Sequence, residues 1–426
     1  MDRRPSAAIV TIGNEITEGR IRDSNGEVLS AFLHSMGFDC RYILSCQDDL
    51  EDILEVFKFL KTSTDCIIVT GGLGPTSDDL TREAIATYCN KKLSLFESEL
   101  RVLKEKYTAR GREFDPINEK QALFPESSKI IENNLGTANG FWLAEDSKII
   151  ISLPGVPVEL ELMLEKGVRE VLDLHFKSIS PSALQIFKVF GRAESSVGRE
   201  ISLLPEAKEF QLGYRASFPE LEVRIRKLDG KLDDNFLSKI GEILGRDYIF
   251  SETEKDSLPN RCHRLLVDSQ KTLSLAESCT GGLATHLLSQ YAGASNYLMG
   301  SAVTYSNQSK NSMLGVDLKT LDNFGAVSHE TASEMACKIR ECFNSELAIS
   351  VTGIAGPNGA TAQKPIGTFY IGLADQQSCT TFRYFFSHER AFVQGYAAHC
   401  MLDTIRRYLL NLPDRKDSCL QEIRRA

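Results

Sequence analysis

The sequence predicts an α/β protein with two three-layer domains, each built on a mostly parallel sheet, joined by a small α+β middle region. Short apolar runs alternate with amphipathic stretches of helical spacing, which is the pattern of βαβ units. This pattern is interrupted near residue 178 and starts again after residue 255. A chain of 426 residues is also longer than one typical hydrophobic core allows. We therefore expect domains over residues 1–177, 178–255 and 256–426.

Three apolar runs in the N-terminal part predict buried parallel strands, with helical spacing between and after them. The strands are AAIVTI (7–12), DCIIVT (65–70) and KIIISL (148–153). Helices are expected over residues 26–36, 50–60 and 158–176.

The middle region has a different pattern. LEVRIRKL (221–228) alternates apolar and charged residues with period two, as a half-exposed strand does. Helical stretches lie on either side, at residues 195–204 and 234–245, and the polar run SETEKDSLP (251–259) predicts a linker.

The alternation of strands and helices then resumes in the C-terminal part. The predicted strands are TLSLAES (272–278), SELAISVT (345–352) and IGTFYIGLA (366–374). The predicted helices cover residues 280–291, 329–343 and 390–410.

Composition excludes several classes of protein. A net charge of −9 argues against a general nucleic-acid binder, which needs a basic surface. Eleven cysteines without a C-x-x-C pair indicate reduced thiols, and seven scattered histidines give no zinc pattern. The apolar run near the N-terminus is too short for a signal peptide or a membrane span. We expect a cytoplasmic protein that binds neither nucleic acid nor membranes.

A glycine-rich loop follows the strand at residues 65–70. GGLGPTSDD (71–79) lies between that strand and an expected helix opening at residues 76–79, so its backbone N–H groups could bind an anion. The loop lacks the G-K-[ST] of a Walker A motif and the third glycine of a dinucleotide fingerprint. Glu15 ends the first strand and could hold a divalent cation together with Asp78 and Asp79. The alternative is that these aspartates only cap the helix.

A second strand–turn–helix segment, LSLAESCTGG (273–282), carries a serine where the strand ends. Ser278 could be a nucleophile beside an oxyanion-stabilising pair of N–H groups from the turn at Thr280, Gly281 and Gly282. The segment does not match the G-x-S-x-G motif of α/β-hydrolases. The alternative is that Ser278 or Thr280 caps a helix.

Two further segments carry groups that could act with this serine. TYSNQSK (304–310) brings Tyr305, Asn307 and Lys310 within about one turn of a helix that begins there. A partly desolvated Lys310 can act as general base for a serine, whereas a surface position is the alternative. TGIAGPNGATAQKPIGT (352–368) is a second glycine-rich loop after a strand and suits a phosphate or ribose. Its candidate residues are Thr352, Gly353, Gly356, Gly359 and Lys364.

Five segments of the N-terminal part resemble the molybdopterin-binding-type domain of CinA proteins, which is related to the MogA/MoaB fold. They are GNEITEGRIRDSN (13–25), TGGLGPTSDDLTREA (70–84), NEKQALFP (118–125), NLGTANGFW (134–142) and LPGVPVEL (153–160). The resemblance implies a phosphate-bearing ligand and, in some members, Mg²⁺-dependent hydrolysis of ADP-ribose. The candidate residues by motif position are Glu15, Asp23, Asn25, Gly72, Gly74, Thr76, Asp78, Asp79 and Glu159.

The C-terminal part closely resembles the CinA C-terminal domain, through AESCTGG (276–282), TYSNQSK (304–310), GAVSHETASEMA (325–336) and TGIAGPNG…KPIGT (352–368). The resemblance implies a nicotinamide-mononucleotide deamidase, an amidohydrolase that needs no cofactor. We assign Ser278, Tyr305 and Lys310 to catalysis. The expected substrate-binding residues are Thr280, Gly281, Gly282, Asn307, Thr352, Gly353, Gly356, Gly359, Lys364 and Arg390.

The sequence departs from the family pattern at two places. Ala360 stands where a third clustered glycine is usual, and residues 387–390 replace the usual Gly-Asp-Arg-Glu, which leaves the register of Arg390 open.

Two other functions remain as alternatives: ADP-ribose pyrophosphatase in the N-terminal domain, alone or in addition, and a competence-associated binding protein with degenerate sites. The expected partner is a small-molecule nucleotide, and we expect a homodimer.

Overall fold

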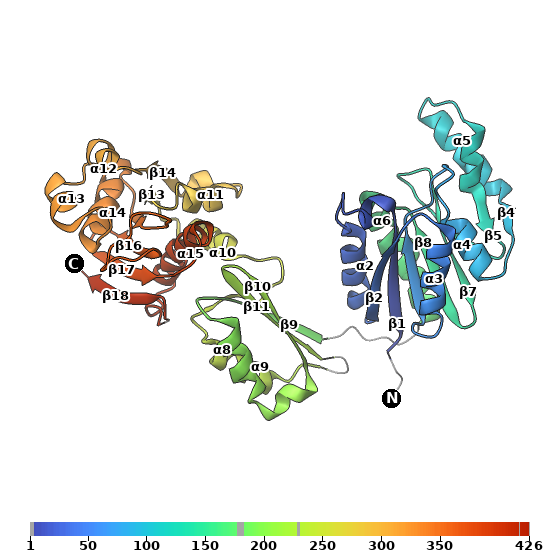
Figure 1. Ribbon diagram of the computed structural model, residues 1–426, viewed down its shortest axis with the longest axis horizontal. Coiled ribbons are helices and arrows are strands. Elements are labelled where there is room, and N and C mark those ends of the chain that lie inside the picture. The colour runs from blue at the N-terminus through green and yellow to red at the C-terminus, as the bar shows by residue number, and fades with distance from the viewer. Residues whose placement is uncertain (1–3, 177–182, 228–230, 417, 426) are drawn as a thin grey trace. The chain divides into compact units, whose positions relative to one another are not determined.

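A computed structural model describes residues 4–176, 183–227, 231–416 and 418–425. The chain divides into two compact units, Met1–Ser182 and Ala183–Ala426, and each is described by itself (Figure 1). No helix in the described ranges is long and apolar enough to traverse a lipid bilayer. The α/β fold class is confirmed.

The first unit is built on a six-stranded sheet with strand order β2-β1-β3-β8-β7-β6. The first four of these strands are parallel, and β7 and β6 are antiparallel to their neighbours. The strands are β1 (Ser6–Ile12), β2 (Asp39–Cys46), β3 (Cys66–Thr70), β6 (Lys129–Ile131), β7 (Gly140–Glu145) and β8 (Lys148–Leu153). A separate two-stranded ribbon pairs β4 (Leu93–Leu95) with β5 (Leu123–Pro125).

Helices cover both faces of this sheet, so the unit has three layers (Figure 1). Alternate residues of β1 and β3 belong to two different cores: Ile9 and Ile68 pack with α2, α6 and α7, whereas Val10 and Ile67 pack with α3 and α4. The helices are α1 (Asn14–Thr17), α2 (Ser24–Ser35), α3 (Leu50–Leu60), α4 (Thr81–Tyr88), α5 (Glu97–Ala109), η1 (Pro116–Ala122), α6 (Pro157–Met163), the π-turn η2 (Leu164–Val168) and α7 (Arg169–His175).

The second unit begins with a four-stranded antiparallel sheet of order β10-β11-β9-β12. Residues of α8 and α9 share a core with this sheet, around Val223 and Phe236. The elements are β9 (Ala183–Phe190), α8 (Glu194–Ser202), η3 (Pro205–Glu209), β10 (Gln211–Ser217), β11 (Glu220–Lys227), α9 (Asp234–Leu244) and β12 (Ile249–Ser251). Phe190 and Phe250 belong to the core of the following sheet, so this middle region packs within the same unit.

The larger sheet of the second unit has the order β14-β13-β15-β16-β17-β18. Strands β14, β13 and β15 are parallel, and each later strand is antiparallel to its neighbour. The strands are β13 (Leu273–Glu277), β14 (Leu298–Val303), β15 (Leu347–Gly353), β16 (Thr368–Ala374), β17 (Cys379–Phe385) and β18 (Leu420–Arg425). The helices are α10 (Leu258–Ser269), α11 (Leu283–Ser289), η4 (Ala294–Asn296), α12 (Asn307–Leu314), α13 (Leu318–Phe324), α14 (His329–Phe343) and α15 (Arg390–Leu409).

The helices that follow the two glycine-containing turns begin later than the sequence predicts. Helix α4 begins at Thr81 and not at residues 76–79, because the Asp79 side chain is bonded within the glycine-rich loop. Helix α11 begins at Leu283, so Gly281 and Gly282 precede the helix and do not form its first turn. Both glycines have positive φ, +66° and +97°, which strains any residue with a side chain.

Candidate active site

The centre of the C-terminal site is a contact between Ser278 and Lys310. Ser278 follows the last residue of β13, and Lys310 lies in the first turn of α12. The Lys310 Nζ lies 2.9 Å from the Ser278 Oγ and donates to the carbonyl oxygen of Thr304 at 2.7 Å. Lys310 is only 1% exposed and Ser278 only 7%. The structure therefore brings together the two side chains that the sequence assigned to proton transfer.

Burial changes the acidity of the lysine. Removing the ammonium group from water lowers the pKa of Lys310 from its ordinary value to about 8. Its bonded partners are a hydroxyl and a carbonyl, and no carboxylate in the described part of the chain forms an ion pair with it. A neutral amine is therefore accessible close to physiological pH, and that form can accept the proton of Ser278.

Glu277, which the sequence analysis missed, organises the turn after the serine. Its buried carboxylate accepts hydrogen bonds from the hydroxyl of Thr280 at 2.7 Å and from the amides of Gly282 at 3.1 Å and Ala284 at 3.2 Å. It also accepts from the amide and the hydroxyl of Thr285, at 2.8 and 2.6 Å. The carboxylate thus takes the place of an N-cap residue for α11. An acid at the end of the predicted core strand was the available signal.

These bonds change which amides can stabilise an oxyanion. The amide of Gly282 donates to Glu277, and that of Gly281 donates to the carbonyl oxygen of Ser278 at 3.1 Å. The expectation that the turn at residues 280–282 supplies both donors is therefore wrong. Within the described residues, the amides of Cys279 and Thr280 donate no hydrogen bond to another residue, so these two N–H groups are the candidate oxyanion donors beside the Ser278 hydroxyl.

A cavity of about 430 Å³ opens onto Ser278. Its walls come from the serine turn, the start of α12, the segment before α14, the glycine-rich loop after β15 and the start of α15. The lining residues are Ser278, Cys279, Tyr305, Gly325, Ala326, Val327, Gly353, Ile354, Ala355, Gly356, Asn358, Gly359, Thr361, Lys364 and Arg390.

Seven predicted site residues line this cavity, and five predicted substrate-binding residues do not. The five that do not are Thr280, Gly281, Gly282, Asn307 and Thr352. The Thr280 hydroxyl is bonded to Glu277, and that of the buried Thr352 donates to the carbonyl oxygen of Ala326 at 2.6 Å. Asn307 is exposed at the first residue of α12. Spacing along the sequence could not show that these residues lie outside the cavity wall.

The mouth of the cavity is cationic. Arg390 donates to the carbonyl oxygen of Gly356 at 2.6 Å and also to the hydroxyl of Tyr305, which is 57% exposed. Lys364 donates to the carbonyl oxygen of Phe324 at 2.9 Å. The lining of this cavity includes two cations and no carboxylate. Arg390 thus reaches the site despite the altered sequence at residues 387–390, and the charge suits an anionic group.

In the N-terminal unit, the glycine-rich loop is fixed from within. The Asp79 carboxylate accepts from the amides of Gly74 at 2.8 Å and Thr76 at 2.9 Å, and from the Thr76 hydroxyl. The buried Arg82 donates to the carbonyl oxygen of Leu73 at 2.8 Å, and burial lowers its pKa to about 10. The sequence analysis missed Arg82, which carries no motif of its own.

Other predicted N-terminal residues are also held by polar contacts. Asp23 accepts from the amide of Gly26 and caps α2. The Asn25 amide donates to the hydroxyl of Thr70 and to the carbonyl oxygen of Gly155. Glu159 accepts from Asn133 at 2.7 Å, and the loop glycine Gly72 has a positive φ of +63°.

The predicted cation site of Glu15, Asp78 and Asp79 is not formed. The described ranges contain no group of three His, Cys, Asp or Glu side chains that could hold one ion. The three carboxylates do lie near Asp48 at one sheet edge: burial raises the pKa of Asp48, and the negative charges of all three raise it further. Asp79 is committed to its own loop, which explains why the three do not converge on one point.

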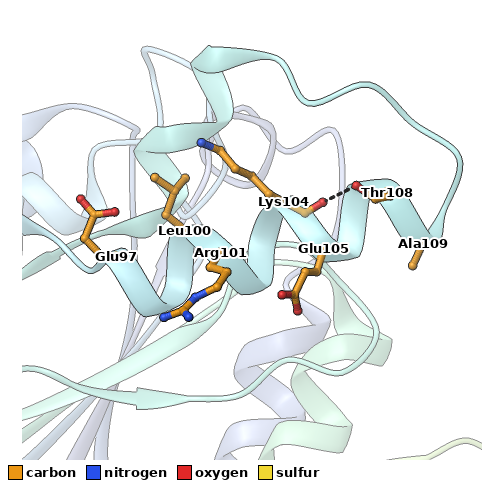
Figure 2. Close-up of a pocket in the computed structure, with 7 residues that line it drawn as sticks. All are labelled: Glu97, Leu100, Arg101, Lys104, Glu105, Thr108 and Ala109. Carbon is orange, nitrogen blue, oxygen red and sulfur yellow. Dashed lines mark hydrogen bonds between the residues drawn. The ribbon is translucent and has the colours of Figure 1, made fainter.

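A second hollow, of about 690 Å³, runs along one face of α5 (Figure 2). All of its lining residues, from Glu97 to Ala109, belong to this helix. This hollow contains none of the predicted site residues and is part of the surface of one helix.

Comparison with known proteins identifies the family. Residues 255–409 match the family model described as "CinA C-terminal domain", and residues 8–173 match "Probable molybdopterin binding domain". A CinA-like protein of Geotalea uraniireducens is 35% identical over 416 residues, covering 95% of this chain and 98% of that protein. The chain belongs to the CinA family. Another CinA-like protein, from Citrifermentans bemidjiense, is 39% identical over 95% of this chain and 97% of its own length.

Structures of CinA proteins have also been solved. One is the crystal structure of "the protein CinA with unknown function" from Thermoplasma acidophilum. It is 36% identical, covers 39% of this chain and 98% of that chain, and has a TM-score of 0.37. The two family models leave residues 174–254 unmatched, so most of the middle region lies outside both.

Proposed function

We propose that the C-terminal domain hydrolyses the carboxamide of nicotinamide mononucleotide to give nicotinate mononucleotide and ammonia. The observation that carries the proposal is the 2.9 Å contact between Ser278 and a buried lysine at a cavity with a cationic mouth. This is the arrangement of a nucleophile with its base. The proposed reaction is also the one that the sequence resemblance implies.

The proposed reaction has two halves. Neutral Lys310 takes the proton of the Ser278 hydroxyl while the oxygen attacks the carboxamide carbon, which forms a tetrahedral oxyanion. The carbon–nitrogen bond then breaks, and the Lys310 ammonium gives its proton to the leaving nitrogen, which departs as ammonia. Water next attacks the resulting ester with Lys310 again as base. The carbon–oxygen bond breaks, the proton returns to Ser278, and nicotinate mononucleotide is released.

The oxyanion would be stabilised by the amides of Cys279 and Thr280. These amides donate no hydrogen bond to another of the described residues, and they follow the nucleophile directly in the chain. Fixed backbone donors of this kind are worth about two to three orders of magnitude in rate in other acyl-transfer enzymes. Cys279 itself is no candidate nucleophile, because burial raises the pKa of its thiol to about 12.

The phosphate of the substrate would bind at the mouth of the cavity. Arg390 and Lys364 supply positive charge there, and the loop at Gly356 and Gly359 leaves the backbone open to a close approach. Tyr305 lies beside Arg390, is 57% exposed, and within the described residues its hydroxyl forms no hydrogen bond with Ser278 or Lys310. Its position favours substrate binding over the activating role that the sequence suggested.

The test is to incubate the purified full-length protein with nicotinamide mononucleotide and to measure ammonia. Ammonia release that is lost in Ser278→Ala, with an unchanged thermal unfolding curve, would support the proposal. A parallel reaction with ADP-ribose and Mg²⁺, measured as AMP, tests the N-terminal alternative. Release of AMP alone, or of neither product, would refute the proposed deamidation, and near-normal turnover by Ser278→Ala would remove the serine from the mechanism.

A further inference from the structure

An aromatic cluster joins the middle region to the start of α15. Phe218 lies in the turn between β10 and β11, and its ring is stacked on Phe386, with centroids 5.7 Å apart. The same ring makes an edge contact with Phe392 at 5.1 Å. His388 is stacked on Phe386 at 5.6 Å and lies 4.3 Å from Phe392. Residues 386–392 therefore surround one side chain of the middle region.

The segment in contact with Phe218 is also part of the cavity wall. Arg390 lies between His388 and Phe392 in sequence, and its guanidinium bonds Gly356 and Tyr305 at the cavity mouth. Helix α15 begins at this arginine, so a shift in the start of the helix moves the guanidinium with it.

A backbone connection extends the same wall to the glycine-rich loop. The amide of Phe386 donates to the carbonyl oxygen of Gly367 at 2.9 Å, and the amide of Gly367 donates to that of Ile354 at 2.8 Å. Phe386 thus contacts Phe218 on one side and is linked to the loop on the other.

We propose that Phe218 is a positioning residue for the C-terminal site: the middle region, through this ring, holds Arg390 and the loop at residues 353–359 in the geometry that binds the anionic substrate. The expected change in KM rests on the proposed function, whereas the positioning role of Phe218 rests on geometry alone. Phe218 is 44% exposed, more than a residue that only fills a core. Aromatic pairs in these geometries contribute beyond the area that they bury.

Substitution of the ring should change binding and leave the chemical step intact. Phe218→Ala removes the ring contacts with Phe386, His388, Phe392 and Tyr396, and we expect KM for nicotinamide mononucleotide to rise about three- to tenfold with kcat within about twofold. Phe218→Tyr keeps the ring, and because the site is partly exposed its hydroxyl can reach solvent, so KM should stay near the original value. Leu203→Ala is the matched control, since Leu203 is an apolar residue of the middle region that is 76% exposed.

Two further measurements separate positioning from a general loss of structure. In an Arg390→Ala background, Phe218→Ala should raise KM by a smaller factor than in the unsubstituted protein, because one of the two elements through which it acts is gone. Hydrogen–deuterium exchange, read by mass spectrometry, should become faster in Phe218→Ala at residues 353–359 and 386–392 and stay unchanged at α14, the helix that precedes β15.

The exchange measurement does not depend on turnover. If the unsubstituted protein releases no ammonia, the proposed function fails, and the exchange pattern still decides whether Phe218 orders the wall around Arg390. Equal exchange in the two proteins at residues 353–359 and 386–392 would overturn the proposal, as would an additive effect on KM in the Arg390→Ala background. A fall in kcat with constant KM would equally contradict it.

Discussion

The proton-transfer role of Lys310 makes a quantitative prediction about pH. The base must be neutral before it can accept the Ser278 proton, so activity should rise with pH through the pKa of the lysine, which is about 8. With that value, about a tenth of the lysine is neutral at pH 7 and about nine tenths at pH 9. We therefore expect kcat/KM for ammonia release to rise about tenfold between pH 7 and pH 9 and then to level off, whereas a lysine with the ordinary pKa of about 10.4 would give a rise of about a hundredfold over this range and a plateau only above pH 10.

The assay is ammonia release from nicotinamide mononucleotide at concentrations well below KM, because kcat/KM reports the free enzyme that the structure describes. Lys310→Met should lower kcat/KM by about two to four orders of magnitude and remove the rise with pH. Lys310→Arg is the matched control, because the guanidinium keeps its positive charge between pH 7 and pH 9 and so cannot accept the serine proton. A flat profile between pH 7 and pH 9 in the unsubstituted protein, or a Lys310→Met variant with the original profile, would refute the assignment.

Two other predictions concern the residues that shape the loops. Glu277→Gln replaces an acceptor of five hydrogen bonds with a group that has one oxygen. We expect kcat/KM to fall about 10- to 100-fold and the free energy of unfolding, measured in urea, to fall by about 2–3 kcal/mol. Glu341→Gln, at an exposed position, is the control and should leave both quantities unchanged. Unchanged activity in Glu277→Gln would show that the turn keeps its shape without the charge. Asp79→Asn should loosen the N-terminal glycine-rich loop, measured as faster hydrogen exchange at residues 71–79, and leave ammonia release as it was. Loss of deamidation in that variant would mean that the two sites have been assigned to the wrong domains.

Sequence patterns predicted the scaffold better than the local polar contacts. The predicted strand at 65–70 is β3 and the predicted helix at 50–60 is α3, because burial imposes a period that is visible in the apolar residues. The start of α11 was predicted three residues early, because a carboxylate outside the helix takes its first amides. Hydrogen bonds between a side chain and the backbone produce no periodic pattern in the sequence.

The same limit explains the errors in the site. Ser278 and Lys310 were predicted to act together because a desolvated lysine can serve as base for a serine and both lie in motifs that resemble one family domain, and their side chains do meet. Thr352 was assigned to substrate binding from its place beside the glycine-rich loop, but side chains alternate across a strand, and its hydroxyl faces Ala326. The contacts of Phe218 join residues more than 160 positions apart, which no local pattern reveals.

The two units place their candidate sites at equivalent points of their sheets. In both, the first strand of the sheet lies between the second and the third, in the orders β2-β1-β3 and β14-β13-β15, so the connections diverge from the first strand. This divergence opens a crevice at the carboxyl ends of parallel strands, where α/β proteins bind ligands. Glu15, Asp48 and the loop at residues 71–79 follow these strands in the first unit, and Ser278, Lys310 and the loop at residues 353–359 follow them in the second.

The charges at these two sheet edges are nevertheless opposite. The first edge collects carboxylates, whose mutual repulsion contributes to the raised pKa of Asp48, whereas the second has the cations Lys364 and Arg390 at a cavity without any acid in its lining. An anionic nucleotide therefore has a direct electrostatic reason to enter the second crevice and would need a counter-charge in the first. If nicotinamide mononucleotide bound the isolated residues 1–176 as tightly as the full chain, this reasoning from charge would be wrong.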